Sequence, residues 1–302
     1  MSFLDKKIFY RETYSLRESM KEKTPSLLRK FFYHVAKTVY FGKYPAVVCS
    51  FFGLQGKTIL SKISIDFELE KNGLRSINCI FLSDFHFGNL TSNKVIKKIE
   101  KIVSENHFDL ILLGGDYIFL DAFAFVEMKQ FIRQFSPPLG IFAVLGNHDR
   151  WLFKDDLKAK FLECGVTLLI NDEIELKPPY NHIKIAGIDD IKYGSPKVNF
   201  SPLKDFEKRI FLSHSPEGLS LVQGEKVDLA LFGHTHGGQI VFNTQKPFLP
   251  FKDRYSKKFP RGVYEEKESG FNFPFYVSSG IGCVWLPIRF NSPSEVVLIE
   301  LI

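Results

Sequence analysis

The stretch Ile-Asn-Cys-Ile-Phe-Leu-Ser-Asp-Phe-His, residues 77–86, decides how the chain is interpreted. Its first seven residues are mainly apolar, which is typical of a strand in a sheet that is covered on both faces. Its last three place a carboxylate and an imidazole two residues apart, at Asp84 and His86. In an extended chain, residues i and i+2 point the same way. The sequence therefore predicts that both side chains enter one pocket at the end of a strand.

Four further polar clusters follow, or lie near the ends of, other apolar runs. They are Gly114-Gly115-Asp116, Gly146-Asn147-His148-Asp149, Ser213-His214-Ser215-Pro216 and Gly233-His234-Thr235-His236-Gly237-Gly238. Together the five clusters hold five of the eight histidines. Open α/β sheets place their ligands at the carboxyl ends of the strands. We therefore expect the five clusters to meet at one site.

Short apolar runs that alternate with helical patterns predict an α/β domain over residues 58–302. The expected strands cover residues 63–69, 77–83, 110–113, 141–145, 183–186, 209–212, 229–232, 239–242, 275–277 and 296–301. The expected helices cover residues 94–106, 122–135, 155–163 and 217–222.

Residues 1–57 form a separate, basic and aromatic segment that is expected to be helical. Apolar pairs recur every four residues over 26–41, which predicts an amphipathic helix with a basic face. Such a helix fits the surface of an anionic bilayer, and it fits equally a helix that packs on the catalytic core. No run reaches the roughly 18 apolar residues of a spanning helix, and the N-terminus lacks the pattern of a secretory signal. We expect a cytoplasmic protein that associates peripherally with the inner membrane.

The composition narrows the class of partner. A net charge of +6 fits an anionic substrate or surface but is too small to indicate nucleic-acid binding. Four scattered cysteines without a CxxC spacing argue against a disulfide framework or a cysteine zinc site. The composition leaves the oligomeric state open.

Phenylalanine is unusually abundant, with 32 residues. Many of them flank the polar clusters or lie in the N-terminal segment and in a later basic loop. We expect much of this excess to surround a groove that leads to the site. The phenylalanines expected around this groove are Phe31, Phe32, Phe51, Phe52, Phe85, Phe87, Phe248, Phe251 and Phe259.

The donors in the polar clusters predict a metal centre. They are Asp84, His86, Asp116, Asn147, His214, His234 and His236. Oxygen and nitrogen donors without sulfur suit Mn²⁺, Fe²⁺ or Zn²⁺. Seven donors exceed one four-coordinate site, so two metals that share a carboxylate are expected.

The order D-x-H, G-D, G-N-H-D, H, G-H-x-H resembles the signature of the calcineurin-like metallophosphoesterases. The resemblance implies a four-layer αββα sandwich and a two-metal centre, with manganese expected and iron or zinc as alternatives, that hydrolyses phosphoester or diphosphate bonds. It implies that Asp84, His86 and His236 hold one ion, that Asn147, His214 and His234 hold the other, and that Asp116 bridges them. It also implies that His148 is the acid for the leaving oxygen, with Asp149 orienting or charging its ring.

Two segments resemble one subgroup of that family, the YaeI/YkuE-type phosphodiesterases. They are the stretch Gly-His-Thr-His-Gly-Gly-Gln at 233–239 and the end of the chain from Gly280 to Arg289, followed by Glu295. The subgroup includes the chlamydial-type UDP-2,3-diacylglucosamine pyrophosphatase (LpxG) of lipid A synthesis. The resemblance, with the basic amphipathic segment, implies a lipid-linked nucleotide substrate that is cleaved to UMP and 2,3-diacylglucosamine 1-phosphate. Two alternatives remain: a broad phosphodiesterase acting on soluble nucleotides or cell-wall phosphodiesters, and a metal-binding scaffold without catalysis.

Several basic residues are candidates for holding the substrate phosphates. Arg289 is expected either to grip a phosphate or to pair with Glu295, and Arg150 follows the G-N-H-D cluster. The loop at 246–261 mixes aromatic, proline and basic residues and contributes Lys246, Arg254 and Lys257. It is expected either to bind a lipid-linked phosphate or the membrane surface, or to be a solvated loop.

Overall fold

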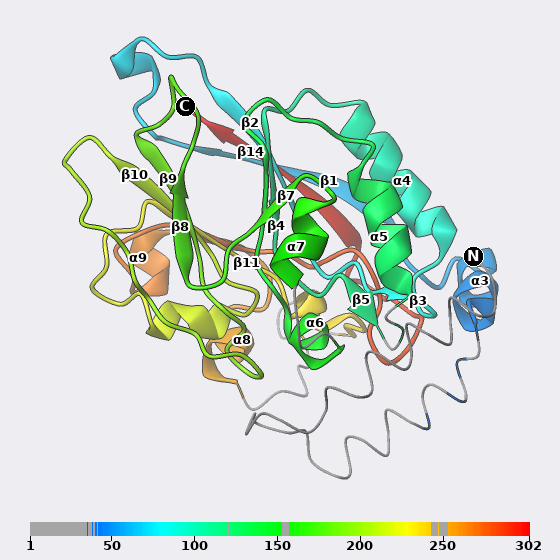
Figure 1. Cartoon of the computed structure of the whole chain (residues 1–302). Coiled ribbons are helices and arrows are strands. Elements are labelled where there is room, and N and C mark those ends of the chain that lie inside the picture. Colours follow the sequence, from blue (N-terminus) through cyan, green and yellow to red (C-terminus); the bar gives the residue numbers. More distant parts are fainter. Residues whose placement is uncertain are drawn as a thin grey trace, which may run out of the picture.

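Two six-stranded sheets form the centre of the molecule in the computed structural model (Figure 1). The structure describes residues 42–119, 121, 123–152, 157–242, 247 and 253–302, together with 35, 38 and 40. The predicted amphipathic helix at 26–41 therefore lies almost wholly outside the described residues, and so does Lys246.

The first sheet has the strand order β1 (Thr58–Ile65), β14 (Ser294–Leu301), β2 (Ile77–Leu82), β4 (Leu110–Leu113), β6 (Ile141–Ala143), β7 (Val166–Leu168). The second has the order β12 (Gly262–Tyr264), β13 (Phe275–Val277), β11 (Leu229–Phe232), β10 (Lys208–Leu212), β9 (Ile183–Gly187), β8 (Asp172–Glu175). Both sheets are mainly parallel, so the carboxyl ends of β2, β4 and β6 point one way, as do those of β9, β10 and β11. A small sheet pairs β3 (Phe87–Gly88) with β5 (Ile118–Phe119).

Helices cover the outer faces of the two sheets (Figure 1). The first sheet carries α4 (Asn93–Ser104), α5 (Ala124–Ile132) and α7 (Leu157–Leu162). The remaining helical elements are α3 (Tyr44–Phe51), α6 (Asn147–Leu152), α8 (Arg254–Lys258), α9 (Glu266–Ser269), η1 (Glu70–Asn72), η2 (Pro216–Ser220) and η3 (His236–Gly238). Helix α4 shows why such elements form: Ser92 caps its first turn by accepting a hydrogen bond from the Val95 amide. Its buried residues, among them Val95, Ile99 and Val103, fall on one face.

Three apolar layers separate the four layers of secondary structure. Along β2, Ile80 and Leu82 pack against the helices, whereas Cys79 and Phe81 pack between the two sheets. A third layer, which includes Phe232 and Phe275, lies on the outer face of the second sheet. Because successive strand residues alternate between faces, a buried sheet needs apolar residues at nearly every position. The four-layer αββα sandwich predicted from the sequence is confirmed.

Some element boundaries differ from the prediction. The first strand begins at Thr58 rather than at residue 63. Residues 239–242 form no strand, because the left-handed φ of 52° at Gln239 turns the chain and leaves one bridge between Ile240 and Phe290. Residues 217–222 form a 3₁₀ turn rather than an α-helix. The short strands β7, β8 and β12 carry too little apolar signal to be recognised from the sequence.

The predicted groove of phenylalanines is wrong for three of the residues named. Phe85 and Phe87 stack on each other at 5.2 Å within the layer between the first sheet and its helices, and Phe259 is buried outside the second sheet. Phe51 and Phe52, in contrast, are 81% and 69% exposed. Phe31, Phe32, Phe248 and Phe251 lie outside the described residues.

Within the described part of the chain, no helix combines the length and the apolar character that crossing a membrane requires.

Candidate metal centre

The polar clusters lie in tight turns at the ends of the central strands. After β2 ends at Leu82, Asp84 and His86 adopt left-handed φ values of 54° and 45°. After β11, His234 and His236 do the same, at 72° and 51°. The expectation that extended backbone aligns these pairs is therefore wrong: the chain turns, and the turn brings the side chains together. Left-handed non-glycine residues are strained and gather at functional sites.

One group of donors contains Asp84, His86 and His236, and its ligand atoms lie within 4.8 Å of one another. The Nε2 atoms of His86 and His236 are 3.0 Å apart. Nε2 of His236 lies 3.4 Å from Oδ1 of Asp84. All three side chains are buried, so their polar atoms face one another rather than water.

A second group contains Asp116, His214 and His234. Nε2 of His214 lies 3.2 Å from Oδ2 of Asp116 and 3.3 Å from Nδ1 of His234. The same Asp116 oxygen lies 3.6 Å from Nε2 of His86, in the first group. Asp116 therefore stands between the two groups, where a bridging ligand would be needed.

Asn147 supplies an independent test of whether these residues fit metal ions. Its Oδ1 is buried and has no hydrogen-bond partner among the described residues. A buried carbonyl oxygen without a partner costs about 1–3 kcal/mol, and a bound cation would remove that cost. Together with the imidazole and carboxylate donors, this oxygen fits divalent cations of the manganese, iron or zinc type.

The electrostatics of the site also call for positive charge. Burial lowers the pKa of the His86 and His236 imidazoles well below the usual value, which keeps them neutral, the form that binds metals. At His214 burial acts in the same direction, but the Asp116 carboxylate outweighs it and raises the pKa of His214 to about 10. The raised pKa of His214 shows that the buried carboxylates require positive charge, which a bound cation would supply in place of the proton.

Comparison with known proteins agrees with this site. Residues 77–238, more than half of the chain, match the calcineurin-like phosphoesterase family. The chain belongs to this family. The phosphoesterase is therefore a metal-dependent hydrolase of phosphoester bonds, and the alternative of a scaffold without catalysis is not supported.

Three bacterial relatives align over most of the phosphoesterase. Phosphodiesterase YaeI of Escherichia coli (strain K12) is 29% identical, covering 77% of this chain and 84% of the relative. The uncharacterized metallophosphoesterase YkuE of Bacillus subtilis (strain 168) is 28% identical, covering 79% and 83%. UDP-2,3-diacylglucosamine pyrophosphatase LpxG of Chlamydia trachomatis is 27% identical, covering 75% and 84%.

Asp149 holds the backbone of the site. Its carboxylate accepts hydrogen bonds from the amides of Asp116, Tyr117 and Gly146, at 2.8, 2.9 and 2.9 Å. These bonds tie the turn after β4 to the turn after β6. Asp149 therefore positions backbone of the site, and its effect on the His148 ring stays a prediction.

His148 lies beside the metal-binding groups. It forms a third group of potential ligands with His86 and Asp116, and its ring centroid is 5.0 Å from that of His86. Its amide donates to Oδ1 of Asp116 at 2.8 Å. The structure thus places His148 next to the centre, and its role as the acid stays a prediction.

Arg289 binds backbone in this structure rather than Glu295. Its buried guanidinium donates to backbone carbonyls, at 2.6 Å to Gly282 and 2.9 Å to Ser279. Further carbonyls of Ser292 and Pro293 accept from Nη1, and Nη2 lies 3.1 Å from Nδ1 of His236. These donors bind the loop that packs against the site, and no ion pair with Glu295 is formed among the described residues. Contact of Arg289 with a phosphate stays a prediction.

The other basic candidates lie at the surface. Arg150 forms an ion pair with Asp189 at 2.6 Å, so its charge is already engaged. Arg254 and Lys257 are exposed, and the Arg254 guanidinium lies 5.5 Å from the ring of Tyr255. Their predicted contact with substrate remains a prediction, as does that of Lys246, which lies outside the described residues.

Sequence reasoning assigned no role to two further residues, Gly146 and Asp253. Gly146 packs against the bridging residue, since a Cβ there would lie 2.1 Å from Oδ1 of Asp116. Oδ2 of Asp253 lies 3.9 Å from Nε2 of His234. Asp253 follows His234 only after a long loop, so no local spacing could have indicated it.

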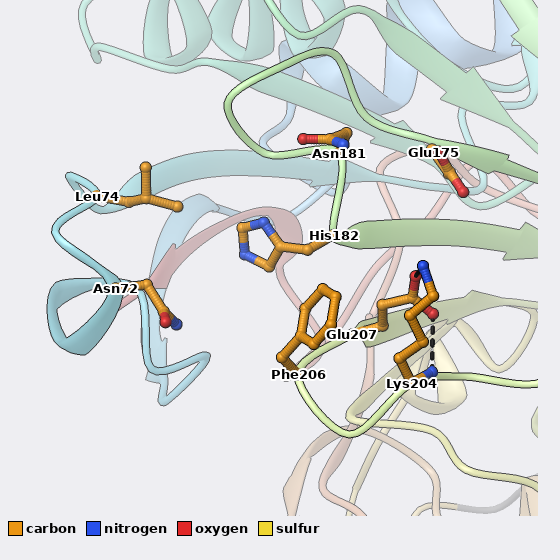
Figure 2. Close-up of a pocket in the computed structure, with 8 residues that line it drawn as sticks. All are labelled: Asn72, Leu74, Glu175, Asn181, His182, Lys204, Phe206 and Glu207. Atoms are coloured by element: carbon orange, nitrogen blue, oxygen red, sulfur yellow. Dashed lines mark hydrogen bonds and ion pairs between the residues drawn. The ribbon is translucent and has the colours of Figure 1, made fainter.

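A cavity of about 370 Å³ lies away from the metal centre, where β9 and β10 begin (Figure 2). The residues around it are Asn72, Leu74, Glu175, Asn181, His182, Lys204, Phe206 and Glu207. None of the predicted site residues belongs to this set. The metal centre lies at the opposite, carboxyl ends of these strands.

Proposed function

We propose that this phosphoesterase hydrolyses UDP-2,3-diacylglucosamine to UMP and 2,3-diacylglucosamine 1-phosphate, while bound peripherally to the cytoplasmic face of the inner membrane. The observation that carries the proposal is a set of exposed apolar residues on and beside the loop whose Arg289 contacts His236. The relative LpxG, a UDP-2,3-diacylglucosamine pyrophosphatase, suggests the substrate, and the exposed apolar surface would accommodate the acyl chains of that substrate.

The exposed apolar surface, here called the apolar rim, is built from two parts of the chain. One part surrounds α3, where Phe51, Phe52 and Leu54 are exposed at 81%, 69% and 44%. The other contains Leu286 and Phe290, exposed at 46% and 49%. The two parts are joined where the Arg289 amide donates to the Leu54 carbonyl at 2.7 Å. Exposed apolar residues that gather in this way indicate an interaction site for lipid or protein.

An aromatic chain connects the apolar rim to the metal centre. Trp285 is 36% exposed and stands edge-on to Phe119, with ring centroids 5.8 Å apart. Phe119 in turn lies 5.5 Å from His86 and 5.0 Å from His148. Trp285 has a left-handed φ of 61°, which is strained for a bulky residue and favours a functional role. A lipid whose acyl chains bind to the apolar rim would thus have its polar head group near the metal-binding residues.

The proposed chemistry divides between the ions and the chain. Two divalent cations, manganese being the proposed ion, supply Lewis acidity toward phosphoryl oxygens and a nucleophile at neutral pH when they are bound. Asp84, His86 and His236 would hold one ion, and Asn147, His214 and His234 the other. Asp116 would hold both. His148 would give a proton to the leaving oxygen, since its ring lies beside both groups.

Incubation of the Mn²⁺-loaded enzyme with UDP-2,3-diacylglucosamine in detergent micelles tests the proposal. We expect equimolar UMP and 2,3-diacylglucosamine 1-phosphate, detected by mass spectrometry, and no product with the Asp84→Ala variant or after chelation of the metal. Absence of product at enzyme concentrations equal to the substrate would overturn the lipid assignment.

A second candidate function is a broad phosphodiesterase, which is favoured by the similarity to the phosphodiesterase YaeI. The variant Phe51→Ser/Phe52→Ser separates the two. If the lipid is the substrate, this change lowers turnover of the acylated nucleotide but not of bis-p-nitrophenyl phosphate. Phe206→Ser is the matched control, because Phe206 is 59% exposed but lines the distant cavity in Figure 2. Equal turnover of the acylated nucleotide by both variants favours the broad phosphodiesterase.

A further inference from the structure

Helix α8 has an unusual N-terminus. Its N-cap residue, Asp253, makes no side-chain capping hydrogen bond, although aspartate is among the best capping residues. Glu217, from η2, performs this task instead, because its Oε1 accepts from the amides of Tyr255 and Ser256 at 2.6 and 2.9 Å. The Asp253 carboxylate is therefore not needed to cap the helix.

The Asp253 carboxylate faces the metal centre instead. Its Oδ2 lies 3.9 Å from Nε2 of His234. The other ring nitrogen of His234, Nδ1, lies 3.3 Å from Nε2 of His214, within the second donor group. The imidazole thus has one nitrogen directed at the donors and one directed at a carboxylate.

A neutral imidazole carries one proton, and the partner of one ring nitrogen decides where that proton resides. At 3.9 Å the Asp253 carboxylate is a charged neighbour of Nε2 rather than its hydrogen-bond partner in this structure, and its negative charge favours a proton on that nitrogen. A proton on Nε2 leaves the lone pair of Nδ1 available to a cation. Carboxylates that orient a ligating histidine in this way raise its basicity. We propose that Asp253 is a positioning residue that holds His234 as the Nε2–H tautomer, with Nδ1 presented to the second metal. The inference rests on the metal centre of the proposed function and not on its substrate.

A second contact joins the same segment to the same turn. Oγ1 of Thr235, the residue next to His234, donates to the carbonyl of Pro260 at 2.6 Å. The two ends of the segment 253–260 thus contact two neighbouring residues of the turn, His234 and Thr235. This segment belongs to the basic loop at 246–261 that the sequence indicated. The proposal therefore gives that loop a role in binding the second metal.

Manganese binding to the full-length protein, measured by equilibrium dialysis and elemental analysis, tests the inference without any substrate. We expect Asp253→Asn and Asp253→Ser to bind one of two Mn²⁺ ions about 10–100-fold more weakly, the usual effect of losing such a carboxylate. Asp253→Glu should restore most of the affinity, because it returns the carboxylate. Asp205→Asn is the matched control, since it removes the same charge from an exposed position.

Serine is as good a residue as aspartate at the N-terminus of a helix, but it has no carboxylate. Asp253→Ser therefore tests the positioning role of the carboxylate without disturbing the start of α8. We expect the metal-free variant to unfold at the same temperature as the metal-free wild type. Wild-type affinity for both ions in Asp253→Asn would overturn the inference. Equal weakening of both ions together with a lower unfolding temperature of the metal-free protein would also overturn it. Because no substrate is used, a failure of lipid hydrolysis leaves these outcomes unaffected.

Discussion

At the scale of single residues, the bridging position of Asp116 has the largest consequence. Its Oδ2 lies 3.2 Å from one imidazole nitrogen and 3.6 Å from another, in different donor groups. Asp116→Asn keeps the shape and removes the charge. We expect the variant to hold fewer than two metal ions and to lose several kcal/mol of transition-state stabilisation, on the order of 100-fold or more in rate.

Metal content by elemental analysis and turnover of bis-p-nitrophenyl phosphate check this expectation. Glu105→Gln, an exposed carboxylate at the end of α4, is the control and should behave as the wild type. Two bound ions and near-normal turnover in Asp116→Asn would show that Asp116 does not bridge.

For Arg289 we predict an effect on the free energy of unfolding. Its removal leaves several buried carbonyls without a donor, and each such group costs about 1–3 kcal/mol. We expect Arg289→Met to lower the free energy of unfolding by roughly 3 kcal/mol or more, measured by urea denaturation of the metal-free protein. Lysine cannot reproduce the fork of donors, so Arg289→Lys should rescue little. If Arg289 instead gripped phosphate, stability would be unchanged and the KM alone would rise.

At the scale of elements, the turns that follow the strands control the site more than the strands do. Gly146, between β6 and α6, leaves no room for a side chain, because a Cβ would lie 2.3 Å from the Asp116 amide nitrogen. We expect Gly146→Ala to cost roughly 1–3 kcal/mol of stability through overpacking and to weaken metal binding, since Asp116 must move. Thermal unfolding and metal content measure the two effects.

Gly165→Ala is the control for this prediction. Gly165 has a left-handed φ of 75° but open space around its Cβ position, so alanine there costs about 1–2 kcal/mol through backbone strain. The control variant should therefore lose stability and keep its metal ions. Equal metal loss in both variants would mean that strain, and not the contact with Asp116, causes the effect.

At the scale of the whole molecule, stability should fall in acid, and Asp109 is one named cause. Burial acts to raise the pKa of Asp109, but hydrogen bonds from Arg75 and from the Asn78 amide outweigh it, so the pKa lies below the usual value. An acid with a lowered folded pKa stabilises the protein above its unfolded pKa of about 4 and loses this contribution as the pH falls through the folded pKa.

Asp109→Asn tests this cause. We expect the variant to be less stable than the wild type by about 1.5–3 kcal/mol at pH 7, the range for hydrogen bonds to a charged group. The difference should shrink below pH 4, where the wild-type carboxylate takes up a proton. Chemical denaturation from pH 3 to pH 7 measures it, and a difference that does not change with pH would exclude Asp109 as a cause.

Local patterns predicted the strands and the donors because both signals are contained in a few consecutive residues. The apolar runs at 110–113, 229–232 and 275–277 coincide with β4, β11 and β13, since a strand buried on both faces has few other possible sequences. The donor clusters are equally local, and they converge because parallel strands end at one edge. The turn geometry that directs the donor side chains toward one another was not predictable. A left-handed backbone conformation at Asp84 or His236 is strained and depends on tertiary contacts that hold it in place.

The amino-acid sequence by itself determined the family, most of the central strands and the candidate metal donors. Tertiary structure alone decided that Asp149 holds backbone, that Arg289 supports a loop, and that Asp253 faces His234. It also decided that Phe85 and Phe87 are core residues, whereas Phe51 and Phe52 are exposed. The physical reason is that a side chain's type limits which partners it can accept, but only the packed fold brings distant parts of the chain close enough to supply them.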